Sequence, residues 1–139
     1  MFSFNKNKSK QAELRKLIDG FQDSFSKEQK AAIIIYLLKT AKCQGTISNK
    51  EGKFIESTSA MLDFSINDTM ITVFLNQGIS IMIDTLRDLS IAQKMWLVVS
   101  VKELLQIDGK VDDIKFKYAS TIFGHIGITD EILGKIETL

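Results

Sequence analysis

The sequence predicts an all-α fold, a single compact helical domain of about seven to eight helices built on a pseudo-symmetric, duplicated helical hairpin. Three observations carry this prediction. The chain has no proline and only eight glycines in 139 residues, whereas folds rich in β-turns need both residues at their corners. It has no alternating run of Val, Thr and Tyr, the pattern typical of strands. The Ser-x-x-Gln or Ser-x-x-Glu signature of a helix start stands at Ser26, Ser48 and Ser90.

Basic side chains are concentrated at the N-terminus. Residues 1–16 carry a net charge of +4 and the whole chain only +1, so the broad basic field of a nucleic-acid-binding domain is missing. We expect residues 1–10 to form a flexible basic arm and residues 11–139 the domain. The arm should make weak, salt-sensitive contact with anionic membranes, the alternative being a solubilising tail. The charged residues are Lys6, Lys8, Lys10, Arg15 and Lys16, against Glu13.

Capping signals mark most of the helix starts. A first amphipathic helix can begin near Ser9. In each Ser-x-x-Gln/Glu box, the serine hydroxyl and the later side chain satisfy two amides that a first helical turn leaves unpaired. The helices that follow Ser26 and Ser90 are apolar well beyond one stripe, so we expect both to lie at the centre. The predicted caps are Ser26, Ser48, Ser90, Asp112 and Thr129.

Two shorter helices are expected between Ser65 and Leu89, separated by Asn76-Gln77-Gly78. Their apolar residues recur at helical spacing and are predicted to face inward. These residues are Met70, Val73 and Phe74, and then Ile79, Met82, Ile83 and Leu86.

The chain contains a repeat at an offset of 64 residues. Gly45 falls on Gly109, and the match continues on both sides with similar caps and apolar positions. The repeated hairpins cover about residues 26–65 and 90–129. Because one helical hairpin cannot bury its apolar face alone, the two should pack around a shared core. Further matched pairs are Ile47 with Val111, Ser48 with Asp112, Leu62 with Ile126 and Ser65 with Thr129.

Three segments together resemble a known family. They are Leu-x-x-Leu-Ser-x-x-Gln-Lys at 86–94, Ile-Asp-Gly-Lys-Val at 107–111 and Ile-Gly-Ile-Thr at 126–129. This pattern resembles the TerB-like helical domain of bacterial tellurite-resistance proteins and of some membrane-anchored co-chaperones. The resemblance spans about residues 26–130. It implies a bacterial role in envelope or metal stress of the tellurite type, and suspected divalent-metal ligands at the hairpins.

Each hairpin keeps only half of the acidic pair that the family carries, an Asp before the turn glycine and a Glu six positions beyond it. The first hairpin has Glu51 but Gln44 in place of Asp, and the second has Asp108 but Lys115 in place of Glu. We therefore expect weak cation binding at either hairpin alone, because a hard cation needs several convergent oxygens. Side-by-side turns could combine Glu51 and Asp108 in one split site.

The candidate metal ligands are Glu51, Asp108, Asp112 and Asp113. Each has a structural alternative. Glu51 can be the capping-box partner of Ser48, Asp108 a turn former before glycine, and the other two a solvated helix start. The spacing excludes an EF-hand loop, since with Gly109 at position six the twelfth position is Lys115. No cofactor is expected apart from a divalent cation.

No pattern of catalytic residues is present, so we do not expect an enzyme. His125 aligns with the core position Met61 and is predicted to be partly packed, and Cys43 to be a small buried hydrophobe. Trp96 and Tyr36 are predicted core or groove residues. With one cysteine and no leader pattern, the expected location is the cytoplasm, with peripheral contact at the inner membrane. The sequence favours a helical interaction module with an unknown protein partner. The alternative is a divalent-cation sensor.

Overall fold

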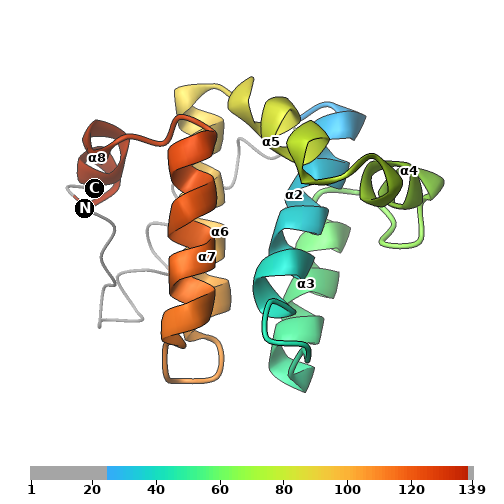
Figure 1. Cartoon of the computed structure of the whole chain (residues 1–139), viewed down its shortest axis with the longest axis horizontal. Helices are drawn as coiled ribbons and strands as arrows, with labels where there is room; N and C mark the ends of the chain where they lie inside the picture. Colours follow the sequence, from blue (N-terminus) through green and yellow to red (C-terminus); the bar gives the residue numbers. More distant parts are fainter. Residues whose placement is uncertain (1–24, 138–139) are drawn as a thin grey trace.

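The computed structural model describes residues 25–137, and these residues form seven α-helices and no strand (Figure 1). The predicted all-α class is confirmed. The predicted arm and the helix expected from Ser9 lie outside the described residues. The helices are α2 (Lys27–Ala41), α3 (Asn49–Met61), α4 (Thr69–Gln77), α5 (Ile79–Arg87), α6 (Ile91–Gln106), α7 (Asp113–His125) and α8 (Asp130–Glu137).

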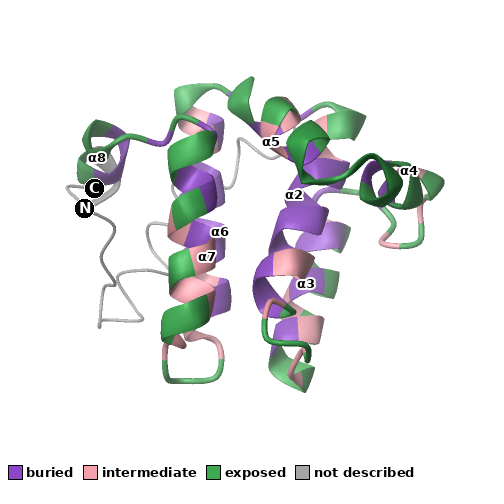
Figure 2. Ribbon diagram, in the orientation of Figure 1, coloured by how far each residue is buried: buried purple, intermediate pink, exposed green. Residues whose placement is uncertain are grey.

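Helices α2 and α6 lie at the centre of the molecule, as their all-round apolar character predicts. Residues 31–37 of α2 and 96–102 of α6 are buried without interruption. Helix α2 contacts every described helix except α8, which packs on α6. In Figure 2 the length of α2 is mainly purple, whereas the outer face of α7 is mainly green.

The two long helix pairs, α2–α3 and α6–α7, turn at the same end of the molecule. Both turns lie at the lower edge of Figure 1, and α5 crosses the opposite end. Gly45 and Gly109 occupy these turns with φ of +101° and +89°, in the region where a side chain is strained and glycine is not. Both turns therefore depend on a glycine at this position.

The predicted caps are also observed. Ser26, Ser48 and Ser90 form complete capping boxes, and Asp112 accepts from the amides of Ile114 and Lys115 at 2.9 and 3.0 Å. Thr129 accepts from the amide of Ile132 at 3.3 Å. Sequence analysis missed the cap of α4, where Asp68 accepts from the amide of Met70 at 2.9 Å.

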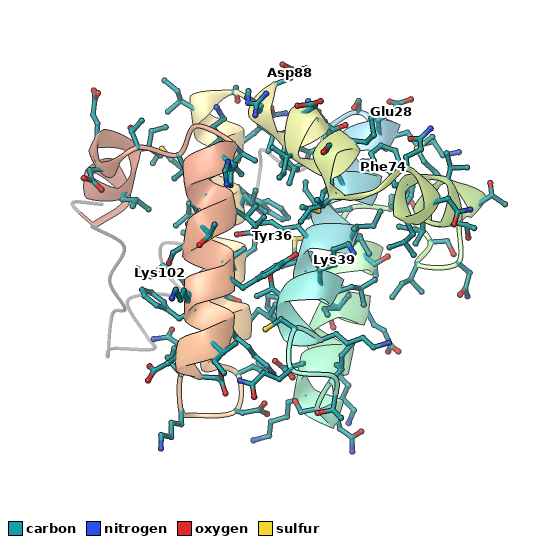
Figure 3. All side chains as sticks on the ribbon, in the orientation of Figure 1. Glu28, Tyr36, Lys39, Phe74, Asp88 and Lys102 are labelled. Carbon is teal, nitrogen blue, oxygen red and sulfur yellow. The ribbon has the colours of Figure 1, made fainter. Side chains whose placement is uncertain are left out.

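Tyr36 joins the two helix pairs across the core. Its hydroxyl donates to the carbonyl of Ala119 at 2.8 Å, and its ring meets Phe123 edge-on with centroids 6.0 Å apart. Figure 3 shows Tyr36 reaching from α2 toward α7. Tyr36 and Trp96 are fully buried, which confirms their predicted place in the core. Burial of Tyr36 raises its pKa well above the ordinary tyrosine value.

Two predicted inward positions are wrong. Val73 of α4 is 50% exposed and Ile79 of α5 is 38% exposed. The buried residues are instead Ile71 and Phe74 in α4 and Met82 and Leu86 in α5. Gly78 ends one helix and begins the next with φ +86°, and the two helices are bent by 108°. Among the described helices, none alone is long and apolar enough to cross a bilayer, and only the bent pair α4–α5 satisfies that test jointly, by length and composition.

Candidate functional site

Three polar side-chain pairs tie the turn of the α2–α3 pair to the turn of the α6–α7 pair. The amide of Gln44 donates to the carboxylate of Asp112. The hydroxyl of Ser48 donates to Asp108 at 3.1 Å. The ammonium of Lys115 donates to both oxygens of Glu51, at 2.9 and 3.1 Å. The two turns therefore lie side by side.

The Glu51–Lys115 pair is largely shielded from water. The side chain of Glu51 is 4% exposed and that of Lys115 is 16% exposed. Glu51 also accepts from the backbone amide of Ser48 at 3.0 Å, so one carboxylate completes the capping box of α3 and neutralises the lysine of α7. A buried charge with this many donors is electrostatically satisfied.

The three pairs are reciprocal about the offset of 64. Their sequence separations are 68, 60 and 64. Gln44 is equivalent to Asp108 at this offset, and Ser48 to Asp112. The pair Gln44–Asp112 therefore becomes Ser48–Asp108 when each residue is replaced by its equivalent at the offset of 64. In the third pair, Glu51 contacts its own equivalent, Lys115.

The four candidate metal ligands do not gather at one point. Glu51 is engaged by Lys115, and Asp112 caps α7. Asp108 and Asp113 are exposed. Within the described part of the chain, no group of three His, Cys, Asp or Glu side chains could hold a metal ion. The donor set as it stands does not fit a divalent cation, and the cation-sensor hypothesis stays a prediction.

The turns shift two pKa values in opposite directions. Hydrogen bonds from the amides of Lys115 and Ile114, and from Gln44, hold the pKa of Asp112 below its ordinary value. Burial raises the pKa of the Cys43 thiol, with the charge of Asp112 adding to the rise and that of Lys115 opposing it. Cys43 is therefore mainly protonated at neutral pH, and its thiol is a weak nucleophile.

A second feature is a pair of apolar hollows that share Tyr118 in their linings. The first, of about 470 Å³, lies between α5 and α7 and has Ile79, Ile83 and Ile114 in its wall. The second, of about 650 Å³, is lined from α2, α4 and α7 and contains Leu38 and Leu75, together with Ile47 from the turn. We call the two hollows and the tyrosine between them the Tyr118 groove.

Sequence analysis did not identify this groove. Ile114, which is 58% exposed, and Leu75, which is 48% exposed, look like ordinary helix residues in the sequence. Two predictions about nearby residues are corrected. His125 is exposed and lines the first hollow. Cys43 is half-buried and lines the second. The one available signal was Gly78, because a break between two apolar helices exposes side chains on both.

Comparison of the chain with protein-family models, with curated proteins and with solved structures found no match. Two features of the structure therefore bear on function, the joined turns and the Tyr118 groove. One is a saturated polar junction between two turns. The other is an open apolar groove.

Proposed function

We propose that the chain is a non-catalytic helical interaction module that binds a protein partner. The observation that carries the proposal is the Tyr118 groove, which has three exposed apolar side chains in its walls. Ile79 and Ile114 line the first hollow, and Leu75 lines the second. Concave apolar surface open to solvent is characteristic of binding sites. Cys43 and His125 line different hollows, which supports binding over nucleophilic catalysis, since a nucleophile and its base must lie within hydrogen-bond reach.

The proposal includes a duplicated, TerB-like hairpin as the scaffold. Its support is the reciprocity of the three turn pairs, the positive φ of both turn glycines and the equal length of α3 and α7, 13 residues each. The link to envelope or metal stress of the tellurite type, and a place in the cytoplasm or at the inner membrane, rest on the family resemblance alone. An experimental structure in which residues 31–65 fail to superpose on 95–129 would refute the duplication.

A divalent-cation sensor remains the second candidate. It is favoured by one observation, that Glu51 and Asp108 both contact Ser48 and so meet at the joined turns. Calorimetric titration of the full chain with calcium, magnesium, zinc and manganese tests it. Tight binding that is lost in Asp108→Ala would replace the interaction module with the sensor. If the chain is an interaction module, none of the four ions should give a binding heat.

Affinity capture from the native organism tests the module itself. Tagged full-length protein should retain the same partner in the presence and absence of EDTA, because the groove needs no cation. Ile114→Gln should lose that partner, and the matched variant Ile91→Gln should keep it. Ile91 is 52% exposed and lines neither hollow. If no partner is retained specifically, the proposed function is wrong.

A further inference from the structure

We propose that the occupant of the Tyr118 groove is an acidic amphipathic helix of a partner protein. This inference rests on the proposed function and names the class of partner. An amphipathic helix presents apolar anchors at positions i, i+4 and i+7 along one face. Two apolar hollows that share one tyrosine in their linings would receive successive anchors of such a face.

Three lysines line the Tyr118 groove, and none of them is held in an ion pair within the described residues. Lys39 and Lys42 line the second hollow and Lys117 lines the first. Neither lining contains Asp or Glu. None of the three lysines makes an ion pair with a residue in 25–137, where the pairs are those of Lys27, Arg87 and Lys115. An apolar floor flanked by free ammonium groups complements apolar anchors flanked by carboxylates.

The same charges argue against two other occupants. The chain's own residues 1–24 have a net charge of +2, so they would bring like charge to the groove. In a symmetric dimer the same patch faces itself, which would oppose the three lysines to their own copies. An anionic membrane satisfies the charge, but a planar surface does not fill two concave hollows.

The shape of the groove also favours a helix over a small ligand. Both volumes lie in the range of about 300–1,000 Å³ typical of ligand sites. Nevertheless both hollows are open to solvent rather than enclosed, so a small molecule bound in either one would stay largely exposed. The exposed residues Leu75, Ile79 and Ile114 belong to three different helices, so one ligand must bridge all three to cover them.

A displayed library of random peptides, about 16 residues long, tests the proposal with the full chain as bait. Selected peptides should be net acidic, with apolar residues at helical spacing. Their affinity, measured by fluorescence anisotropy, should fall at least tenfold in Ile114→Gln and in the double variant Lys42→Gln/Lys117→Gln. It should also fall as salt concentration rises. Bound peptide should slow alkylation of Cys43 by iodoacetamide, because Cys43 lines the second hollow.

Matched variants separate the groove from the rest of the surface. Ile91→Gln and the double variant Lys50→Gln/Lys53→Gln change equally exposed residues that line neither hollow, and both should bind peptide as the native chain does. Ile114→Gln should fold, since Ile114 is 58% exposed, and circular dichroism checks this. Vesicles of anionic lipid serve as the competing probe.

Three results would overturn the inference. The selection could enrich no peptide at all, the enriched peptides could be neutral or basic, or Ile114→Gln could leave peptide binding unchanged. Vesicle binding lost in Ile114→Gln, without peptide binding, would assign the groove to a membrane surface. Failure here is distinct from failure of the proposed function. If affinity capture retains a partner that also binds Ile114→Gln, the module stands and its interface lies elsewhere.

Discussion

At the residue scale, the ammonium of Lys115 joins the two turns through the carboxylate of Glu51. Glu51 is almost fully buried and accepts from Lys115 through both oxygens. A carboxylate in this position without its partner would be an uncompensated buried charge. The sequence shows Lys115 in place of the expected Glu, but it could not establish that Glu51 and Lys115 touch, because the contact joins residues 64 apart.

The first prediction concerns this ion pair. Lys115→Met should lower the free energy of unfolding by about 3 kcal/mol, because it leaves the carboxylate of Glu51 buried and unpaired. Adding Glu51→Gln should recover much of the loss, since the amide oxygen can still accept from Ser48. Urea unfolding followed by circular dichroism measures both variants.

Lys27→Met is the matched control for the ion pair. Its partner Asp68 lies 3.5 Å away, and the lysine side chain is 58% exposed, so the control should cost no more than about 1 kcal/mol. Equal losses in Lys115→Met and Lys27→Met would mean that the buried pair contributes no more than a surface pair.

The second prediction is a pH dependence at Cys43. Burial raises the pKa of its thiol, so alkylation should reach half its maximal rate at a higher pH than it does for free cysteine. Asp112→Asn should move that midpoint down, because the negative charge of Asp112 is one cause of the rise. The fold should survive, as asparagine is an equally good helix cap.

The raised pKa of Cys43 also makes the stability of the fold depend on pH. The unfolded chain releases the thiol proton at a lower pH than the folded chain does. Cys43 therefore contributes stability below the ordinary thiol pKa, and this contribution is lost as the pH rises through the folded value. An alkylation midpoint at or below that of free cysteine would contradict the assigned environment.

At the element scale, helix boundaries could be predicted because they depend on local chemistry. Ser26, Ser48 and Ser90 each make the two hydrogen bonds that their boxes predict. The cap at Asp68 was missed, although Asp68 directly precedes the helix that begins at Thr69. The faces of α4 and α5 were mispredicted at Val73 and Ile79, because periodicity does not report the 108° bend between two short helices.

The third prediction tests the turn at Gly109. Gly109→Val should lower the free energy of unfolding by about 1–3 kcal/mol, because a β-branched residue is strained at φ +89°. No atom lies within 4 Å of the added Cβ, so the cost comes from the backbone alone. Gly109→Asn should cost less, since asparagine tolerates positive φ better than valine does. Unchanged thermal melts for the valine variant would show that the turn adjusts freely.

At the scale of the whole molecule, the predictable part is the central layer and the unpredictable part is the groove. The apolar content of α2 and α6 predicts that both are surrounded by other helices. The Tyr118 groove depends on how α5 is laid against α7 and α4 against α2. Such long-range packing leaves no periodic signal in the sequence. The polar junction is intermediate, since the offset of 64 predicts which positions are equivalent but not that they touch.

The last prediction uses that equivalence. If Glu51 and Lys115 occupy matching positions on a local two-fold axis, their charges should be exchangeable. Glu51→Lys alone places two ammonium groups together, and Lys115→Glu alone places two carboxylates together. Each should lower the free energy of unfolding by about 3 kcal/mol or more. The double exchange restores opposite charges at the same junction.

The helix caps should exchange along with the charges. Glu51 stands at the third position of α3, after the cap Ser48, and Lys115 stands at the third position of α7, after the cap Asp112. In the double exchange the carboxylate at position 115 can reach the amide of Asp112, so the loss of one reciprocal cap is offset by the gain of another. We expect the double variant to lie within about 1 kcal/mol of the native chain. Urea unfolding monitored by the single, buried Trp96, with EDTA present throughout, provides the measurement. A double variant that loses the sum of the two single effects would show that the two turns are not equivalent and would refute the duplicated hairpin.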